Sequence, residues 1–195
     1  MKAAGLILAA GESRRMGSPK ALLPYGNATF LDTLTALFGR YCDPVIVVLG
    51  AQAETILAAA ASPASFVVNA DYARGMTTSL QCGLRAVPPG AEGVLFTLVD
   101  HPAASPAVIE ALLAPRHPHD GPLVRVPRYG AKRGHPIFFA RELMAEFLAL
   151  PADGPARDVV ARHAARTQYL DLDDPGVVAD IDSPEDYRAL LGVRA

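Results

Sequence analysis

The sequence predicts an α/β fold built around a mostly parallel sheet, and three observations support this prediction. Short apolar runs alternate with amphipathic segments of helical period along the chain. The runs are rich in β-branched residues, as expected for strands that are covered on both faces. Hydrophobic residues make up 51 % of the 195 residues, which is enough for a substantial core. We therefore expect a single domain over residues 1–195.

Four apolar runs are the predicted strands of this sheet. They lie at residues 4–9, 44–49, 65–68 and 93–99. Each is a short, continuous apolar stretch of the kind that fits a buried strand. Because helical segments separate them, we expect right-handed crossovers between parallel neighbours.

Amphipathic helices are predicted between and after these runs. Residues 29–40 and 77–87 each place their apolar side chains on one stripe. Ser-Pro pairs at 105–106 and 183–184 are signals for a helix cap followed by a first turn. The pattern therefore predicts four helices, two of them with a marked start.

The stretch 115–133 interrupts this alternation, because it is rich in Pro, Gly, His and Arg. Two short apolar segments, 123–126 and 136–139, have the length of strands. We expect them to form a small β-ribbon in an excursion over the face of the domain that carries the functional site.

Charge and composition exclude several classes of protein. The 18 basic and 20 acidic residues leave a net charge of −2, which gives no general attraction to nucleic acid or to an anionic membrane. No apolar stretch reaches the ~18 residues of a membrane span, and no signal peptide is recognisable. We expect a cytoplasmic protein in which Cys42 and Cys82 are buried, reduced thiols.

The loop after the first predicted strand carries the strongest functional signal. It contains Gly11 and Gly17, which let the backbone approach a ligand, and the cations Arg14, Arg15 and Lys20. Successive N–H groups in such a loop can hold phosphate oxygens. The loop is neither a Walker loop nor a GxGxxG turn. A phosphate-binding loop is the favoured interpretation, and a solvated basic turn is the alternative.

Residues 8–20 read LAAGESRRMGSPK, which resembles the signature LAAGxSxRMGxxK of the MobA-like nucleotidyltransferases at every defined position. Later segments resemble the branch of the family that contains molybdenum cofactor cytidylyltransferase. They read GMTTSL (75–80), LVDHP (98–102), RGHP (133–136) and DIDSPEDY (180–187). The resemblance spans nearly the whole chain and implies a Rossmann-like three-layer sandwich. One departure is Pro155, at the glycine position of the D-x-G-A-R motif that family members often carry.

The resemblance implies a nucleotide site made largely by the opening loop. Lys20, Arg14 and Asp100 would be its catalytic residues. Asn69, Gly75 and Ser79 would lie near the base and ribose, although an Asx-turn is an equal alternative for Asn69. The full set of implied nucleotide-binding residues is Leu8, Ala9, Ala10, Gly11, Ser13, Arg14, Gly17, Lys20, Asn69, Gly75 and Ser79.

Two aspartates are candidate ligands for Mg²⁺. Asp100 follows a predicted strand, where α/β sheets bind ligands, and Mg²⁺ prefers one or two carboxylates together with substrate phosphates. The resemblance implies that Asp100 and Asp182 hold the ion. The alternatives are a turn role for Asp100 and helix capping for Asp182.

The resemblance also implies a set of acceptor-binding residues, which are His101, Arg133, Gly134 and His135. The alternatives are an orienting role for His101 and a cationic turn at Arg133.

The resemblance implies the transfer of CMP from CTP to molybdopterin, with release of pyrophosphate. Ala10 stands where related GTP-using enzymes often have glycine, and its methyl group favours a pyrimidine. A molybdoenzyme or its chaperone is the expected delivery partner. Alternatives are a guanylyltransferase, a transferase acting on a sugar or polyol phosphate, a non-catalytic cofactor-binding chaperone, and a kinase-like phosphoryl transferase, which the missing Walker loop disfavours.

Overall fold

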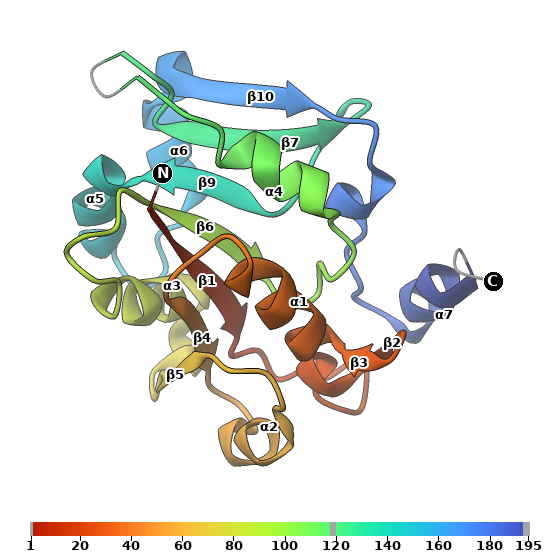
Figure 1. The fold of residues 1–195 in the computed structure, drawn as a ribbon. Helices are drawn as coiled ribbons and strands as arrows, with labels where there is room; N and C mark the ends of the chain where they lie inside the picture. Colours follow the sequence, from red (N-terminus) through yellow and green to blue (C-terminus); the bar gives the residue numbers. More distant parts are fainter. Residues whose placement is uncertain (1, 118–119, 193–195) are drawn as a thin grey trace.

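The computed structural model describes residues 2–117 and 120–192 and has the predicted α/β architecture (Figure 1). The strands are β1 (Ala3–Ala9), β2 (Pro24–Tyr25), β3 (Ala28–Thr29), β4 (Val45–Leu49), β5 (Ser65–Val68), β6 (Gly93–Leu98), β7 (Val124–Tyr129), β8 (Lys132–Arg133), β9 (Ile137–Ala140) and β10 (Thr167–Asp171). The helices are α1 (Phe30–Gly39), α2 (Ala53–Ala59), α3 (Met76–Arg85), α4 (Pro106–Leu112), α5 (Met144–Leu148), α6 (Arg157–Arg162) and α7 (Pro184–Gly192). Short 3₁₀ helices lie at Lys20–Leu22, Tyr72–Arg74, Arg141–Leu143, Ala164–Arg166 and Pro175–Val178.

One sheet runs through the molecule in the order β10-β7-β9-β6-β1-β4-β5, with β8 paired to β7. β1 is parallel to both of its neighbours, β4 and β6, and β5 is parallel to β4. β9 runs antiparallel to β6 and β7. The carboxyl ends of β1 and β6 therefore meet at the same edge of the sheet, where the opening loop and Asp100 follow.

The two segments predicted as a ribbon are strands, but they belong to the main sheet rather than to an excursion. β9 is inserted between β6 and β7, where Phe138 and Phe139 are fully buried. Gly93 on β6 makes room for this, because a Cβ there would collide with the Phe138 ring. Burial of two aromatic rings is the physical reason that the segment joins the core.

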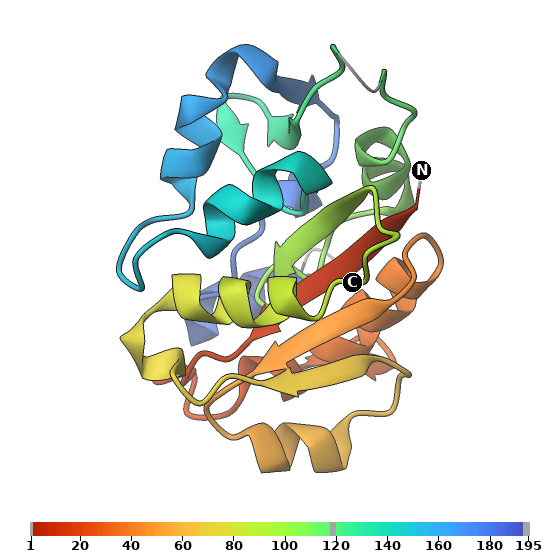
Figure 2. The ribbon, with the colours of Figure 1, turned by 90° about the vertical axis from the view of Figure 1, so that its left-hand side faces the viewer.

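Helices cover both faces of the sheet, as a three-layer sandwich requires (Figure 2). α1 and α4 lie on one face, and α3, α5 and α6 lie on the other. Every residue of β1 and β4 is buried, which confirms the expectation for strands covered on both faces. The two cysteines are free thiols, with Cys42 buried and Cys82 only half-buried.

Local sequence explains how the helices begin and how closely they pack. The Thr29 hydroxyl accepts a hydrogen bond from Asp32 N (3.0 Å), which caps α1, and Phe30, Leu34 and Phe38 fill the predicted apolar stripe. On the opposite face, α3 crosses β1 and β4 at Gly83, where a Cβ would collide with side chains of both strands. In the described part of the chain, no helix is both long and apolar enough to cross a bilayer.

Candidate active site

A cavity of about 610 Å³ opens at the carboxyl edge of β1 and β6. The loop that follows β1 forms one wall, and the start of α3 forms another. Residues of the predicted site that line the cavity are Leu8, Ala9, Ala10, Gly11, Ser13, Arg14, Lys20, Gly75, Ser79, Asp100 and Asp182. Tertiary structure thus brings most of the predicted nucleotide site and both predicted metal ligands to one place.

The opening loop is folded so that its three cations, Arg14, Arg15 and Lys20, line this cavity. Ser13 and Gly17 both adopt the left-handed backbone conformation, with φ of 53° and 69°. The Ser13 hydroxyl accepts a hydrogen bond from Lys20 N (3.0 Å), which closes the loop and fixes the start of the Lys20 side chain. Arg14 is exposed, pairs with Glu12, and has a raised pKa because of that hydrogen bond.

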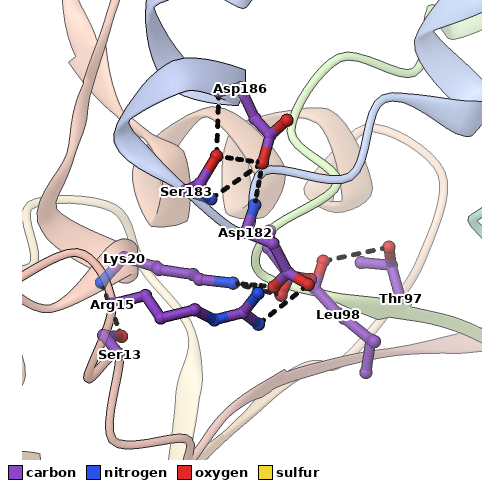
Figure 3. A network of polar contacts seen from close by, with 9 residues as sticks. Ser13, Arg15, Lys20, Thr97, Leu98, Asp182, Ser183 and Asp186 are labelled. Atoms are coloured by element: carbon purple, nitrogen blue, oxygen red, sulfur yellow. Dashed lines mark hydrogen bonds and ion pairs between the residues drawn. The ribbon is translucent and has the colours of Figure 1, made fainter.

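Lys20 is the centre of the charged network at the site (Figure 3). Its Nζ lies 3.0 Å from Asp100 Oδ2 and 2.6 Å from Asp182 Oδ1. The Lys20 side chain is only 12 % exposed. Arg15 reaches the other oxygen of Asp182, with Nη2 2.9 Å from Oδ2. One lysine therefore joins the end of β6 to the segment before α7, two regions that are distant in sequence.

The ion pairs have a direct effect on proton affinity. The hydrogen bond from Lys20 lowers the pKa of Asp182, and Arg15 adds to this effect. Burial opposes the charge on Lys20, but its hydrogen bonds and ion pairs with Asp182 and Asp100 outweigh burial and raise its pKa. At neutral pH Lys20 is therefore protonated and Asp182 is ionised. A charged lysine on the wall of the cavity can bind an anionic substrate.

The cap of α7 leaves the Asp182 side chain free for this network. Asp186 Oδ2 accepts hydrogen bonds from Asp182 N (3.2 Å) and Ser183 N (2.8 Å), and the Ser183 hydroxyl accepts from Asp186 N (3.2 Å). Ser183 and Asp186 thus make the cap, as Figure 3 shows. Asp182 contributes no side-chain oxygen to it, so the capping alternative does not describe this residue.

The predicted acceptor residues lie outside the cavity, beyond Asp100. His101 and His135 come together, with ring centroids 4.6 Å apart, and both have a pKa lowered by burial, that of His135 to about 3. Gly134 packs against Val177, whose carbonyl accepts a hydrogen bond from His135 N (2.8 Å). The guanidinium of Arg133 lies over the Tyr169 ring, 4.8 Å from its centroid.

Two predicted nucleotide-binding residues, Gly17 and Asn69, do not line the cavity. Gly17 allows the loop to turn, because it adopts the left-handed backbone conformation. Asn69 is buried, and its Nδ2 donates to the hydroxyls of Thr78 (2.9 Å) and Ser79 (3.0 Å) while its Oδ1 accepts from Asp71 N. Its polar atoms are used to hold the start of α3, because a buried amide needs partners within the protein. The Asx-turn interpretation therefore describes Asn69 better than a ligand contact.

Several side chains at the site were not among the predicted residues. Arg15 was expected only as part of the basic loop, yet it binds Asp182. Ile56, Tyr72 and Met76 also line the cavity and add apolar surface to it. Met76 lies in the GMTTSL segment, but no motif marks Ile56 or Tyr72. Asp180 was not predicted as a site residue either, although the sequence carried a signal for it, namely its spacing of two residues from Asp182.

A basic loop at the carboxyl edge of an α/β sheet, with its lysine held between two aspartates, is typical of one class of enzyme, the nucleotidyltransferases. The chain belongs to the MobA-like NTP transferase family, whose domain model matches residues 5–167. This confirms both the resemblance and the expected fold class.

Three known proteins illustrate the similarity. Nicotine blue oxidoreductase of Paenarthrobacter nicotinovorans is 32 % identical, and the match covers 96 % of this chain and 95 % of that protein. Molybdenum cofactor cytidylyltransferase of Escherichia coli is 26 % identical over 93 % and 92 % of the two chains. The structure of Rv0371c from Mycobacterium tuberculosis in complex with manganese has a TM-score of 0.81 and 31 % identity, covering 98 % of this chain and 99 % of that one. The relatives carry different activities in their names, so no single relative fixes the substrate.

Proposed function

We propose that this protein transfers CMP from CTP to molybdopterin and releases pyrophosphate, acting as a single domain. The observation that carries the proposal is the position of Lys20, held between Asp100 and Asp182 on the wall of the cavity that the opening loop also lines. A non-catalytic nucleotide carrier does not need a buried cation between two carboxylates at the place where a triphosphate would bind.

The reaction is an in-line displacement at the α-phosphorus of the nucleotide. A phosphate oxygen of the acceptor forms the new P–O bond, the bond to the bridging oxygen breaks, and pyrophosphate leaves with that electron pair. No covalent enzyme intermediate is needed, so positioning and charge neutralisation supply the rate. Lys20 binds the α-phosphate, while Arg14 and the loop amides hold the β- and γ-phosphates.

The donor set fits a divalent cation. Asp100 Oδ1 is buried and, among the described residues, has no hydrogen-bond partner, so it is an anionic ligand atom that remains to be satisfied. Asp100 and Asp182 would hold Mg²⁺, which supplies further neutralisation of phosphate charge when bound. The Asp182 carboxylate also accepts a hydrogen bond from Lys20, and this contact orients the lysine side chain at the cavity wall.

Ala10 supports cytidine as the base. It is 6 % exposed and lines the cavity, so its methyl group takes up space that a glycine would leave open. A narrower pocket favours a pyrimidine over the larger guanine. The acceptor would bind next to the cavity, on the side of His101, Arg133, Gly134 and His135, which do not line the cavity itself.

A pyrophosphate-release assay tests the proposal. CTP, GTP and ATP are each supplied with and without molybdopterin and with and without Mg²⁺, and we expect release to be fastest with CTP, molybdopterin and Mg²⁺ together. Asp100→Ala should lower the rate at least about a hundredfold, because it removes a ligand of the cation that would neutralise charge on the reacting phosphate. Asp173→Ala, a change of an exposed aspartate away from the cavity, is the matched control.

Each other outcome points to a definite alternative. Faster release with GTP would make the protein a guanylyltransferase and overturn the argument from Ala10. Release with a sugar or polyol phosphate but not with molybdopterin would replace the acceptor. Nucleotide binding without any release would favour the cofactor-binding chaperone, which delivers molybdopterin to a molybdoenzyme, and the appearance of a nucleoside diphosphate would indicate a kinase.

A further inference from the structure

A second group of metal-ligating side chains lies next to the cavity. Asp100, His101 and Asp180 each offer one ligand atom, and these atoms lie within 4.8 Å of one another. His101 and Asp180 do not line the nucleotide cavity. The group therefore shares Asp100 with the proposed Mg²⁺ site but extends away from it, toward the segment that precedes Asp182.

The backbone holds the two contributing segments side by side. Ile181 N donates a hydrogen bond to Asp100 O (3.0 Å), and His101 N donates to Leu98 O (3.2 Å). Ile181 is 2 % exposed and anchors its segment in the core. These contacts hold the three ligand residues close together, as a preorganised site requires.

Two atoms in the group remain to be satisfied. His101 is only 7 % exposed, and its Nδ1 has no hydrogen-bond partner in the part of the chain that the structure describes. Asp100 Oδ1 is also buried and, among the described residues, has no hydrogen-bond partner. A buried polar atom without a partner is destabilising, so a bound ion that uses these atoms would be favoured.

The ring of His101 is also held in orientation. It packs against His135 with ring centroids 4.6 Å apart, and His135 in turn meets the edge of Phe96 at 5.7 Å. An imidazole whose plane is fixed by its neighbours is typical of a ligand residue, because outer contacts orient the nitrogen that binds the ion.

We infer that Asp100, His101 and Asp180 form a binding site for a divalent transition metal such as Mn²⁺. Two carboxylates and an imidazole make a mixed oxygen and nitrogen donor set, which suits a transition metal, whereas Mg²⁺ prefers oxygen ligands alone. The inference rests on the proposed function in one respect, since Asp100 would serve both this ion and the Mg²⁺ of the nucleotide site. Shared carboxylates of this kind are a feature of two-metal sites in phosphoryl chemistry.

Titration of the full chain with MnCl₂ in the absence of nucleotide tests the inference, because it needs no turnover. Free Mn²⁺ is measured by electron paramagnetic resonance, and we expect one tightly bound ion per chain. Asp180→Asn should weaken binding at least about tenfold. Asp180 is exposed, so this substitution should leave the fold intact, which circular dichroism verifies. Asp173→Asn, the same change at another exposed aspartate, should bind as the unmodified chain does.

Three results would overturn the inference. One is the absence of Mn²⁺ binding to the unmodified chain without nucleotide. Another is unchanged binding by Asp180→Asn, and the third is loss of binding in Asp182→Asn while Asp180→Asn keeps it, which would locate the ion at the proposed Mg²⁺ site. Failure of the proposed function is distinguishable, because it would appear as no pyrophosphate release by the unmodified chain, whatever the Mn²⁺ titration shows.

Discussion

Replacing Lys20 by Met tests the central ion-pair network more directly than any other single change. Methionine keeps most of the length of the side chain but leaves Asp100 and Asp182, each within 3.0 Å of the lost nitrogen, without their shared cation. The two neighbouring carboxylates then repel each other. The Asp100 side chain is only 18 % exposed, so water replaces the lost lysine poorly.

The expected cost follows from burial. Breaking a fully buried ion pair by removing one partner costs about 3–5 kcal/mol, while an exposed pair contributes about 0–1 kcal/mol. Lys20 is 12 % exposed but Asp182 is 40 % exposed, so water screens part of the network. We expect Lys20→Met to lower the free energy of unfolding by about 2 kcal/mol, between these two limits.

Arg15→Met is the matched control, because it removes another cation from the same carboxylate. The Arg15 side chain is 68 % exposed, so its loss should cost less than about 1 kcal/mol. Urea unfolding followed by circular dichroism gives both values. Equal costs for the two substitutions would refute the argument that burial of Lys20 sets the strength of the network. Pyrophosphate release should also fall by about 10²–10³ in Lys20→Met, since the lysine binds the reacting phosphate.

Two further predictions concern proton binding and backbone packing. The hydrogen bond from Lys20 holds the pKa of Asp182 below its ordinary 3.8, so the ionised carboxylate stabilises the fold above that pH, and this contribution is lost as the pH falls through the lower pKa of the folded state. As the pH falls below 3.8 the unmodified chain should therefore lose more stability than Lys20→Met, and parallel urea titrations giving identical losses would contradict this. Gly134→Ala should lower the free energy of unfolding by about 1–3 kcal/mol, and with it the melting temperature, because the new methyl group collides with the carbonyl oxygen of Val177. The control Gly39→Ala places its methyl group in open space and should have little effect on the melting temperature.

The sequence alone determined the fold class and the location of the basic, glycine-bearing loop that lines the cavity. Alternating apolar runs and amphipathic segments reflect local periodicity, and periodicity follows from the backbone geometry of strands and helices. The spacing of glycines and cations in the opening loop is equally local, so Lys20, Arg14 and Gly11 were placed at the site before any contact was known. The order of β9 in the sheet was missed because an apolar segment shows that it is buried but does not specify its neighbours.

Only the tertiary structure decided which charged groups meet. Lys20 is 80 residues from Asp100 and 162 residues from Asp182, separations over which no local pattern carries information. Folding also brought the Asn69 amide into a hydrogen bond with the Thr78 hydroxyl on α3, and it brought Asp180 close to His101. The physical reason is that the partner of a buried polar group is chosen by the packing of the whole core, which positions side chains from distant segments and excludes the water that would otherwise bind them.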